Sequence, residues 1–156
     1  MEWPIVRRAV VDDVEELLRL RALMFSSMGI SDDDGSWTAS TSEALEHGLS
    51  EGSIVGAVIE RDGDARLCGA GILHILRALG SPQFPRGVAG HINSVAVEPE
   101  SRRHGCGESI IRFLVDAAVS AGVERVELHA SREGEGIYRR IGFRDRGGGP
   151  ELRLEL

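Results

Sequence analysis

One stretch in the second half of the chain constrains the fold more than any other, because it predicts a strand, a glycine loop and a helix in succession. The apolar run Ile92 to Val97 is followed by Arg102-Arg103-His104-Gly105-Cys106-Gly107, and an amphipathic run, Ile110 to Ala121, comes next. Such a loop points several backbone N–H groups at one place, and the helix N-terminus adds a partial positive charge. We therefore expect an anion, most simply a phosphate, to bind at this loop.

The rest of the chain predicts further strands and helices. Strands are expected at residues 5–9, 54–60, 65–76, 91–97, 125–130, 143–145 and 152–156. Helices are expected from Asp12 or Asp13 to Gly29, and at 40–48, 107–121 and 133–141. The first of these helices has apolar residues on one face, namely Val14, Leu17, Leu18 and Met24. Because strands and helices alternate in the second half, we expect an α/β architecture with a mixed sheet, in a single domain spanning residues 1–156.

Turn signals separate several of these elements. Ser40 and Glu43 have the spacing of a capping box for the second helix. Asp62-Gly63 is a strong hairpin signal between two of the strands. The segment 77–90 contains two prolines and three glycines, which predicts a long loop, and long loops in compact domains often carry function.

The charged residues exclude several classes of function. The net charge of −7 argues against nucleic-acid binding and weakly favours a cationic or neutral substrate. All 18 basic residues are arginine, so Schiff-base chemistry and the lysine of a P-loop are excluded. Biased codon usage is sufficient to explain the missing lysine, and the chemical exclusion stands either way.

Cysteine, histidine and apolar patterns add further limits. Cys68 and Cys106 are too few for a disulfide framework, and the five histidines are scattered, so we expect free thiols and no metal site. No apolar run approaches the roughly 20 residues of a membrane span. The start of the chain, Met1-Glu2-Trp3-Pro4, lacks the pattern of a signal peptide. We expect a cytoplasmic protein with no membrane partner.

The glycine loop taken alone leaves three interpretations open. A dinucleotide-binding fingerprint requires a third glycine where this chain has Ile110, which makes that interpretation weak. A P-loop requires Gly-Lys-Ser/Thr, which is absent. A glycine turn that binds nothing is the remaining alternative, since such turns are common.

Two motifs together narrow these alternatives. Arg102-x-x-Gly105-x-Gly107 resembles the Gln/Arg-x-x-Gly-x-Gly/Ala signature of the GCN5-related N-acetyltransferase (GNAT) superfamily, and the preceding Val95-Ala96-Val97-Glu98-Pro99 resembles its usual strand end. Downstream, Gly136-Ile137-Tyr138-Arg139-Arg140-Ile141-Gly142-Phe143 resembles the second signature of the superfamily, in which a tyrosine precedes Gly-Phe. The match is close over residues 91–143, whereas the N-terminal half fits the order of elements without diagnostic residues.

The resemblance implies a GNAT-like mixed central sheet flanked by helices and acetyl-CoA as the cofactor. The loop amides that would cradle its pyrophosphate are those of Arg103, His104, Gly105, Cys106, Gly107 and Glu108. Arg102 and Arg103 add positive charge there, or are simply solvated loop residues. Val95 and Val97 would offer backbone groups to the peptide-like pantetheine arm, and the N–H near Val95 could polarise the thioester carbonyl. Cys106 occupies a variable position, and a catalytic role for it is not expected.

The resemblance also implies catalytic residues. Tyr138, the only tyrosine of the chain, occupies the position of the general acid that protonates the leaving thiolate; the alternative is a packing tyrosine. For the base, three alternatives stay open: His91, deprotonation through water, or another residue. An imidazole suits proton transfer near neutral pH. Asn93 shares the face of His91 by strand alternation, while His74 and His129 are interpreted as structural.

One departure from the family pattern concerns the segment before Tyr138. Ser131 stands where the family often has asparagine, and it can still hydrogen-bond the pantetheine with less reach. Gly134 replaces the usual alanine, and together with Gly136 it is expected to loosen the short helix that holds Tyr138. Affinity for the cofactor is in question more than its identity.

The expected function is transfer of an acetyl group from acetyl-CoA to a primary amine of a small molecule or peptide by direct attack. The alternative is a catalytically silent acyl-CoA-binding regulatory module, and a nucleotide-binding protein is a third. Segments 23–37 and 77–90 would select the acceptor, unless the apolar residues of the first are core and its aspartates a solvated turn. A homodimer is common in this superfamily, and residues 152–156 are a candidate contact.

Overall fold

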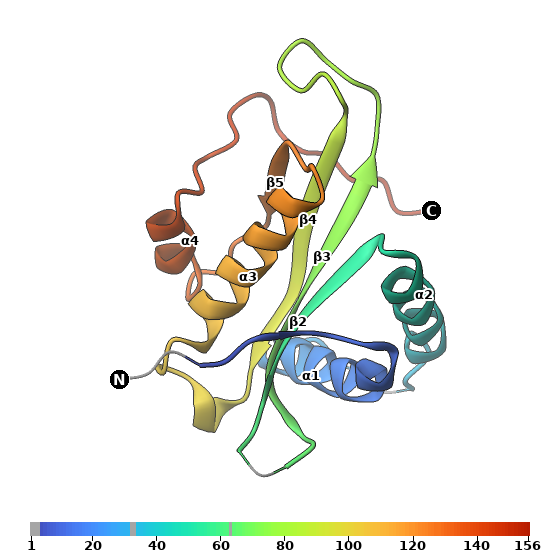
Figure 1. The fold of residues 1–156 in the computed structure, drawn as a ribbon. Coiled ribbons are helices and arrows are strands. Elements are labelled where there is room, and N and C mark those ends of the chain that lie inside the picture. Colours follow the sequence, from blue (N-terminus) through green and yellow to red (C-terminus); the bar gives the residue numbers. More distant parts are fainter. Residues whose placement is uncertain (1–3, 32–33, 63) are drawn as a thin grey trace.

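A five-stranded mixed sheet forms the centre of the molecule, with its strands in the order β1-β2-β3-β4-β5 (Figure 1). The computed structural model describes residues 4–31, 34–62 and 64–156. The strands are β1 (Arg7–Arg8), β2 (Ile54–Glu60), β3 (Leu67–Arg77), β4 (Val88–Val97) and β5 (Arg125–Leu128). The pairs β1–β2, β2–β3 and β3–β4 are antiparallel, and β5 runs parallel to β4. The predicted α/β class with a mixed sheet is confirmed.

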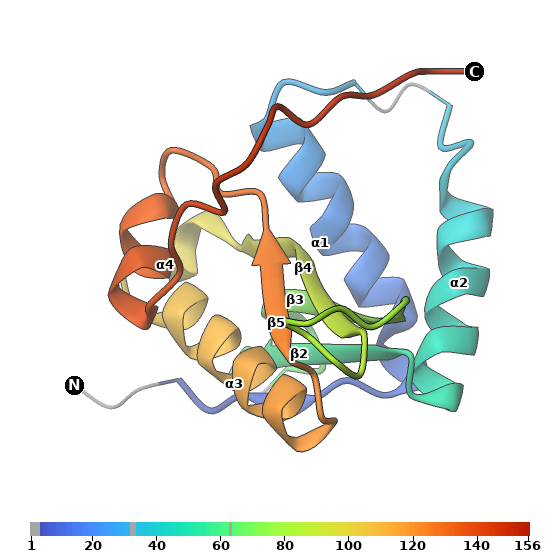
Figure 2. The ribbon, with the colours of Figure 1, turned by 90° about the horizontal axis from the view of Figure 1, so that it is seen from above.

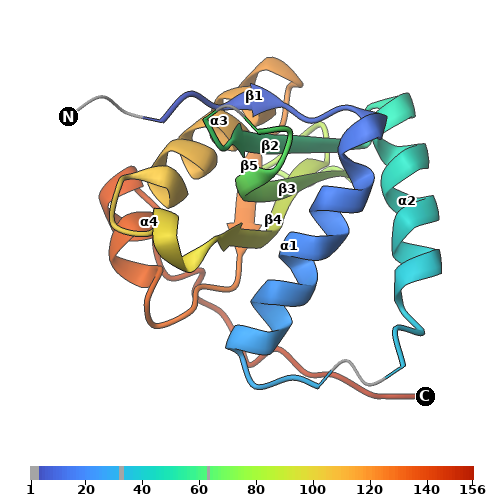
Figure 3. The same cartoon turned by 90° about the horizontal axis from the view of Figure 1, so that it is seen from below.

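The helices cover both faces of this sheet. One face carries α1 (Val14–Ser27) and α2 (Thr38–Glu51), and the other carries α3 (Cys106–Ser120) and α4 (Glu135–Ile141), as Figures 2 and 3 show from above and below. Two short 3-10 turns, η1 (Val11–Asp13) and η2 (Pro99–Ser101), precede α1 and follow β4. The arrangement places the glycine loop at the carboxyl end of β4 and the β3–β4 loop at the opposite end (Figure 1).

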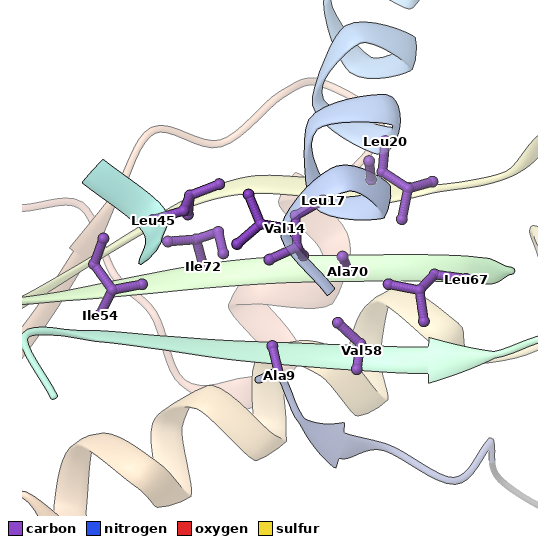
Figure 4. Close-up of a cluster of buried hydrophobic side chains, with 11 residues drawn as sticks. Ala9, Val14, Leu17, Leu20, Leu45, Ile54, Val58, Leu67, Ala70 and Ile72 are labelled. Atoms are coloured by element: carbon purple, nitrogen blue, oxygen red, sulfur yellow. The ribbon is translucent and has the colours of Figure 1, made fainter. Parts of the chain in front are cut away.

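Two hydrophobic cores form because the strand residues alternate between the two faces. Ala70 and Ile72 of β3 pack with Leu17 and other side chains under α1 and α2 (Figure 4). Leu73 faces the other side, where Ile110 and the rest of the α3 stripe are fully buried. Burying one such aliphatic side chain stabilises the fold by about 1.5–3 kcal/mol. The sheet therefore separates an α1/α2 core from an α3/α4 core.

A β-bulge interrupts the pairing of β3 with β4. Ala70 is opposite Ala96 and Ile72 is opposite Asn93, so two residues of β4, Ser94 and Val95, oppose the single residue Gly71. Ser94 adopts a left-handed backbone with φ of 55°. A Cβ on Gly71 would lie 2.6 Å from Ile110 Cγ2, so this glycine lets α3 approach the sheet closely.

β4 and β5 separate beyond the bulge. Their parallel pairing covers only Ala89 to Ile92 of β4, which faces Arg125 to Leu128 of β5. In the described part of the chain, no strand pairs with the β5-facing edge of β4 from Asn93 to Val97. This leaves backbone groups of β4 available at the level of the bulge.

The structure corrects two of the predicted helix boundaries. The predicted capping box is wrong, because α2 begins at Thr38 and the Ser40 hydroxyl lies inside the helix, where it donates to the Trp37 carbonyl at 3.1 Å. The helix also continues past Gly48 to Glu51, with Gly52 as its left-handed C-cap. Gly48 does not end the helix: a Cβ there would lie 2.5 Å from Ile54, so it is a packing glycine.

The predicted strands at 143–145 and 152–156 are wrong. Residues 143–156 contain no strand, and Leu152, Leu154 and Leu156 are strongly exposed. Alternating leucines fit one face of a strand, but a strand also requires a paired edge, and this segment has none: it passes β5 with only side-chain ion pairs, such as that of Glu151 with His129, and extends to a free end (Figure 2). Consequently the proposed dimer contact at 152–156 does not exist as a preformed strand.

Other differences are shifts of a few residues. The first strand shortens to Arg7–Arg8, the predicted loop 77–90 shrinks to 78–87, and α4 begins at Glu135 rather than at residue 133. Gly63 of the predicted hairpin turn, Asp32 and Asp33 lie outside the described residues. The hairpin itself is confirmed, because Arg61 N–H donates to the Arg66 carbonyl at 2.9 Å where β2 turns back into β3.

Candidate functional site

The glycine loop leaves the first turn of α3 open to a ligand. Gly105 is the N-cap with φ of 80°, a left-handed conformation that suits glycine, and Arg103 before it has φ of 63°. No side chain of the described residues caps α3, and the Ser109 N–H donates to the Gly105 carbonyl at 3.0 Å, one turn into the helix. The N–H groups of the first helical turn therefore lack partners within the helix and fit an anionic group.

Side chains around this loop have clear positions. Arg102, Arg103 and His104 are exposed, and Arg102 Nε donates to the Val97 carbonyl at 3.1 Å. The Glu108 carboxylate forms ion pairs with Arg112 on its own helix and Arg140 of α4. None of these contacts closes the loop over the amides.

Cys106 has a packing role in this structure. The side chain is buried in the α3/α4 core, and burial raises the pKa of its thiol. A raised pKa keeps the sulfur protonated, so it is a poor nucleophile at neutral pH. This agrees with the expectation that Cys106 is not catalytic.

Val95 and Val97 lie where β4 is unpaired on its β5 side. Their side chains pack into the α3/α4 core, which fixes the strand while its β5-facing edge stays free. A peptide-like ligand can add to such an edge through main-chain hydrogen bonds. The edge lies next to the open turn of α3, so one extended ligand can reach both.

Tyr138 lies on α4, which packs against the first turn of α3. A Cβ on Gly107 would be 3.7 Å from Ile137 Cδ1, which shows how closely the two helices approach. The Tyr138 ring is half-buried and makes an edge contact with Phe143, with 5.9 Å between ring centroids. Burial raises the pKa of the phenol. Its hydroxyl makes no hydrogen bond within residues 4–31, 34–62 and 64–156, so the proton is held and available.

The loop before Tyr138 corrects the expectation for Gly134, whereas Gly136 lies inside the helix as expected. Gly134 is the N-cap of α4 rather than a helical residue, and its N–H donates to Ser131 Oγ at 3.1 Å. A Cβ on Gly134 would lie 3.0 Å from Tyr138 Cε2. This glycine makes room for the tyrosine ring, and Ser131 orders the turn while its hydroxyl hydrogen remains free to donate.

His91 lies on the α1/α2 face of β4. It pairs across the sheet with His74 of β3, and its ring centroid is 6.1 Å from that of His129. His129 lies just beyond β5 and is exposed. Asn93 lies two residues along β4 and shares the face of His91, as the alternation predicted.

A cavity of about 310 Å³ opens between this face of the sheet and the helices α1 and α2. Its floor is apolar and includes Leu45, Ile54 and Ile72, which Figure 4 shows converging above β2 and β3. Its polar lining residues are Arg21, Ser40, Thr41, His74, Asn93 and Ser94. The cavity thus meets β4 at the bulge, on the face opposite the α3/α4 core.

His74 and Arg21 are two of the lining residues that the sequence analysis missed as site residues. His74 was interpreted as structural, but it faces the cavity, and burial lowers the pKa of its imidazole, helped by the nearby charges of His91 and Arg21. Arg21 follows Leu17 by one helical turn, on the face whose apolar spacing predicts a buried residue. An arginine on that face was the available signal.

The described residues of segment 23–37, which the sequence analysis expects to select the acceptor, do not line this cavity. Phe25 and Trp37 contact each other edge to face, with centroids 5.4 Å apart, but neither lines the cavity. Asp34 is exposed, and its carboxylate accepts from the Ser36 N–H at 2.9 Å. The walls come instead from positions earlier in α1 and from the first half of α2.

The described residues contain no cluster of three His, Cys, Asp or Glu residues suited to a metal ion. None of their helices is both long and apolar enough to cross a membrane.

The sequence profile of the acetyltransferase (GNAT) family matches residues 14–143. The chain belongs to this family. The GNAT match contains both motifs, the glycine loop and the Tyr138 segment, and confirms the resemblance on which they were interpreted.

Similar proteins of known name agree with this assignment. The chain is 37% identical over 65 residues to a glucosamine 6-phosphate N-acetyltransferase of Trypanosoma brucei brucei, covering 40% of this chain and 44% of the other. It is 32% identical over 110 residues to glucosamine 6-phosphate N-acetyltransferase 1 of Oryza sativa subsp. japonica, covering 66% of this chain and 64% of the other. The chain therefore spans from under half to about two thirds of the length of these relatives.

Solved structures show the same GNAT fold along nearly the whole chain. A predicted acetyltransferase of Clostridium acetobutylicum, crystallised with acetyl-CoA, has a TM-score of 0.86 at 21% identity and covers 96% of both chains. A glucosamine-6-phosphate N-acetyltransferase of Arabidopsis thaliana has a TM-score of 0.74 at 21% identity, covering 99% of this chain and 100% of that one. At such identities the likeness concerns the fold.

Proposed function

We propose that this protein is an acetyl-CoA-dependent N-acetyltransferase that acetylates a primary amine of a small molecule or peptide. The observation that carries the proposal is the uncapped first turn of α3, which lies beside the unpaired edge of β4 and against the helix that bears Tyr138. Membership of the acetyltransferase (GNAT) family supports the reaction class.

The donor site would be built from backbone groups. The amides of Arg103 to Glu108 would hold the pyrophosphate, with Arg102 and Arg103 adding charge, and Val95 and Val97 would pair with the pantetheine arm. Ser131 would donate its hydroxyl hydrogen to the same arm. When bound, acetyl-CoA supplies an activated acetyl group as a thioester. These residues fit it because the helix start and the strand edge are open together.

Tyr138 would act as general acid. The raised pKa of the phenol keeps its proton in place at neutral pH, and the hydroxyl has no competing partner among the described residues. A positioned phenol of this kind can protonate a departing thiolate. Its half-buried ring packs edge to face on Phe143, which would orient the C–O bond of the phenol.

Deprotonation of the amine would fall to the histidines of the cavity face or to water that they hold. His91 is the proposed base: it lies on this face of β4 beside the cavity rather than in its lining, whereas Asn93 does line the cavity and could orient a water or the acceptor. His74 is a second candidate, because its lowered pKa leaves the imidazole neutral and able to accept a proton. Variants of each histidine, compared by their pH–rate profiles, separate these roles.

The experiment that tests the proposal combines binding with turnover. Thermal unfolding is measured with and without acetyl-CoA, with ADP as the control ligand. A ligand at 100 times its Kd adds about 2.7 kcal/mol of stability, which is several degrees in Tm for a domain of this size. Release of coenzyme A thiol is then followed with a panel of amines that includes glucosamine 6-phosphate, the acceptor in the names of the relatives.

The outcomes distinguish the alternatives. Stabilisation specific to acetyl-CoA together with thiol release in the presence of an amine supports the enzyme. Stabilisation without release from any amine indicates the silent acyl-CoA-binding module instead. Equal stabilisation by ADP and acetyl-CoA indicates a nucleotide site, and overturns the proposed donor.

A further inference from the structure

Arg21 is drawn into the interior of the protein without a carboxylate partner. Its Nε is fully enclosed and has no hydrogen-bond acceptor within the described residues, and none of their ion pairs includes this arginine. Its Nη1 donates to Ser94 Oγ at the bulge, and the Ser94 hydroxyl donates to Asn93 Oδ1 at 3.0 Å. The guanidinium is thus fixed at the junction of α1 and β4.

Arg19, the preceding arginine of α1, shows the usual arrangement, in which carboxylates pair with the guanidinium. Arg19 donates to Glu16 and to the buried Glu98, at 2.6 Å and 2.8 Å, so its charge is compensated. Arg21 instead lies over the aromatic rings of Phe25 and Trp37, with its Cζ 4.8 Å and 6.0 Å from the ring centroids. Aromatic faces attract a cation only weakly compared with a carboxylate.

Among the described residues, no acidic side chain lines the cavity that Arg21 lines. The described lining is apolar apart from hydroxyls, an amide, one histidine and this guanidinium. Arg21 therefore carries the formal charge of this lining at neutral pH. Burial lowers the pKa of Arg21, which records the free energy lost when the charge leaves water. A desolvated charge without a counter-charge is unfavourable, and a ligand anion would restore the balance.

We propose that Arg21 binds an anionic group, a phosphate or a carboxylate, on the amine that occupies this cavity. The inference rests on the proposed function, because it takes the occupant to be the acceptor of acyl transfer. A guanidinium recognises both anions through its N–H donors, and Arg21 presents its guanidinium to the cavity that it lines. Ser94, held in its left-handed conformation by the bulge, orients the guanidinium from the other side.

The proposal reverses what the whole-chain charge favours. The net charge of −7 favours a cationic or neutral substrate, whereas the cavity itself is positive. Polyamines and the lysine side chains of basic peptides would therefore be poor acceptors. A small molecule that carries both an amine and an anion fits better, and the cavity volume of about 310 Å³ suits a molecule of that size.

The test compares matched amines that differ only in the anion. The kcat/KM values are measured for glucosamine 6-phosphate against glucosamine and for serine against serinamide, with spermidine as the cationic probe. The wild type is expected to favour the anionic member of at least one pair by about tenfold or more, in line with a charge-assisted contact. Arg21→Met should abolish this preference, and Arg21→Lys should retain part of it. Arg8→Gln removes one exposed charge on β1, outside the cavity lining, and should change nothing.

Two results would overturn the inference. One is a wild-type preference for the neutral members and spermidine, and the other is an unchanged anion preference in a folded Arg21→Met variant. Binding of glucosamine 6-phosphate and inorganic phosphate is also measured by calorimetry without acetyl-CoA. Arg21-dependent phosphate binding with no acetyl-CoA binding would sink the proposed function and leave the anion site standing. If Arg21→Met still binds both inorganic phosphate and glucosamine 6-phosphate like the wild type, the anion site is wrong and the proposed function is unaffected.

Discussion

Tyr138 and Gly134 are in close contact: a Cβ added to Gly134 would lie 3.0 Å from Cε2 and 3.2 Å from Cζ of the tyrosine ring. Gly134 has ordinary right-handed φ and ψ angles, so alanine would not strain its backbone. The missing methyl group matters because of the ring that occupies its place. The position of the proposed acid therefore depends on a glycine four residues earlier.

Gly134→Ala is expected to lower kcat by about tenfold, because a displacement of the phenol well under 1 Å already weakens catalysis by a positioned group. Binding of acetyl-CoA, measured by thermal shift, should change little. Gly136→Ala is the matched control: its Cβ would meet only Arg140 Nη1 at 3.9 Å, and helix propensity should then stabilise the fold by roughly 0.5–1 kcal/mol. Equal rates for the two variants would show that the ring tolerates the methyl group.

Tyr138→Phe is expected to lower kcat by about 100-fold with little change in KM for acetyl-CoA, since only proton donation is lost. Its Tm should stay close to that of the wild type, because the hydroxyl has no partner in the described part of the chain and the ring keeps its contact with Phe143. Steady-state kinetics at saturating donor check the first point. A variant with full kcat would remove the acid role and leave a packing tyrosine.

The raised pKa of Tyr138 sets the alkaline limit of this activity. The unfolded phenol ionises near pH 10, and the folded one ionises above that value, so the acid form is retained throughout the neutral range. The stability that this group contributes is present below pH 10 and is lost as pH rises through the folded pKa. A kcat profile that fell on the alkaline side well below pH 9 would point to a different group.

Gly105 and Gly122 allow the role of the loop to be separated from backbone strain. Both are left-handed, with φ of 80° and 77°, and they flank the two ends of α3. Replacement by alanine should cost each protein about 1 kcal/mol of stability. Only Gly105→Ala should also weaken acetyl-CoA binding, which isothermal titration measures directly. If the two variants bind acetyl-CoA with comparable affinity, this loop is not part of the acetyl-CoA site.

His74 should make stability fall in mild acid. Its folded pKa is lowered by burial and by the charges of His91 and Arg21, so the unfolded chain binds the proton first. The contribution is fully present above the unfolded pKa of about 6.5 and is lost as pH falls through the folded pKa. Urea unfolding at pH 7.5 and pH 5 should show a smaller loss for His74→Gln than for the wild type. Identical losses would contradict the shift.

Arg21→Met is expected to keep or raise the free energy of unfolding, by up to about 1 kcal/mol, while anionic acceptors are lost. A desolvated charge without a counter-charge destabilises the folded state, and methionine preserves most of the packing. Thermal unfolding in buffer without anionic ligands checks this expectation. A large drop in Tm would mean that the Ser94 contact holds α1 against β4.

The parts of the site that could be predicted from the sequence are local. The glycine loop and Tyr138 each belong to a short motif whose conformation depends on neighbouring residues, and the structure places both as the motif implies. His74 and Arg21 could not be placed in this way. Their meeting depends on the register of β3 against β4 and on how α1 packs, and both of these are long-range.

The errors have the same origin. The alternating leucines of 152–156 satisfy the local pattern of a strand, yet no edge receives them in this chain. Glycine is a residue type that often ends a helix, which made Gly48 look like a helix end. Gly48 is instead required because Ile54, from the following strand, packs against it. A local sequence pattern predicts well whether a segment forms a helix or a strand. It predicts which other segment that element packs or pairs with only where a motif specifies the pairing.

The division of the interior into two cores has a consequence for how such a protein can diverge. Residues that share no contacts have nearly additive effects on stability, and the sheet keeps the α1/α2 core apart from the α3/α4 core. Substitutions that reshape the cavity under α1 and α2 should therefore leave the loop at α3 undisturbed. A lineage built on this plan can exchange one acceptor for another by altering its first fifty residues, with its donor machinery inherited intact.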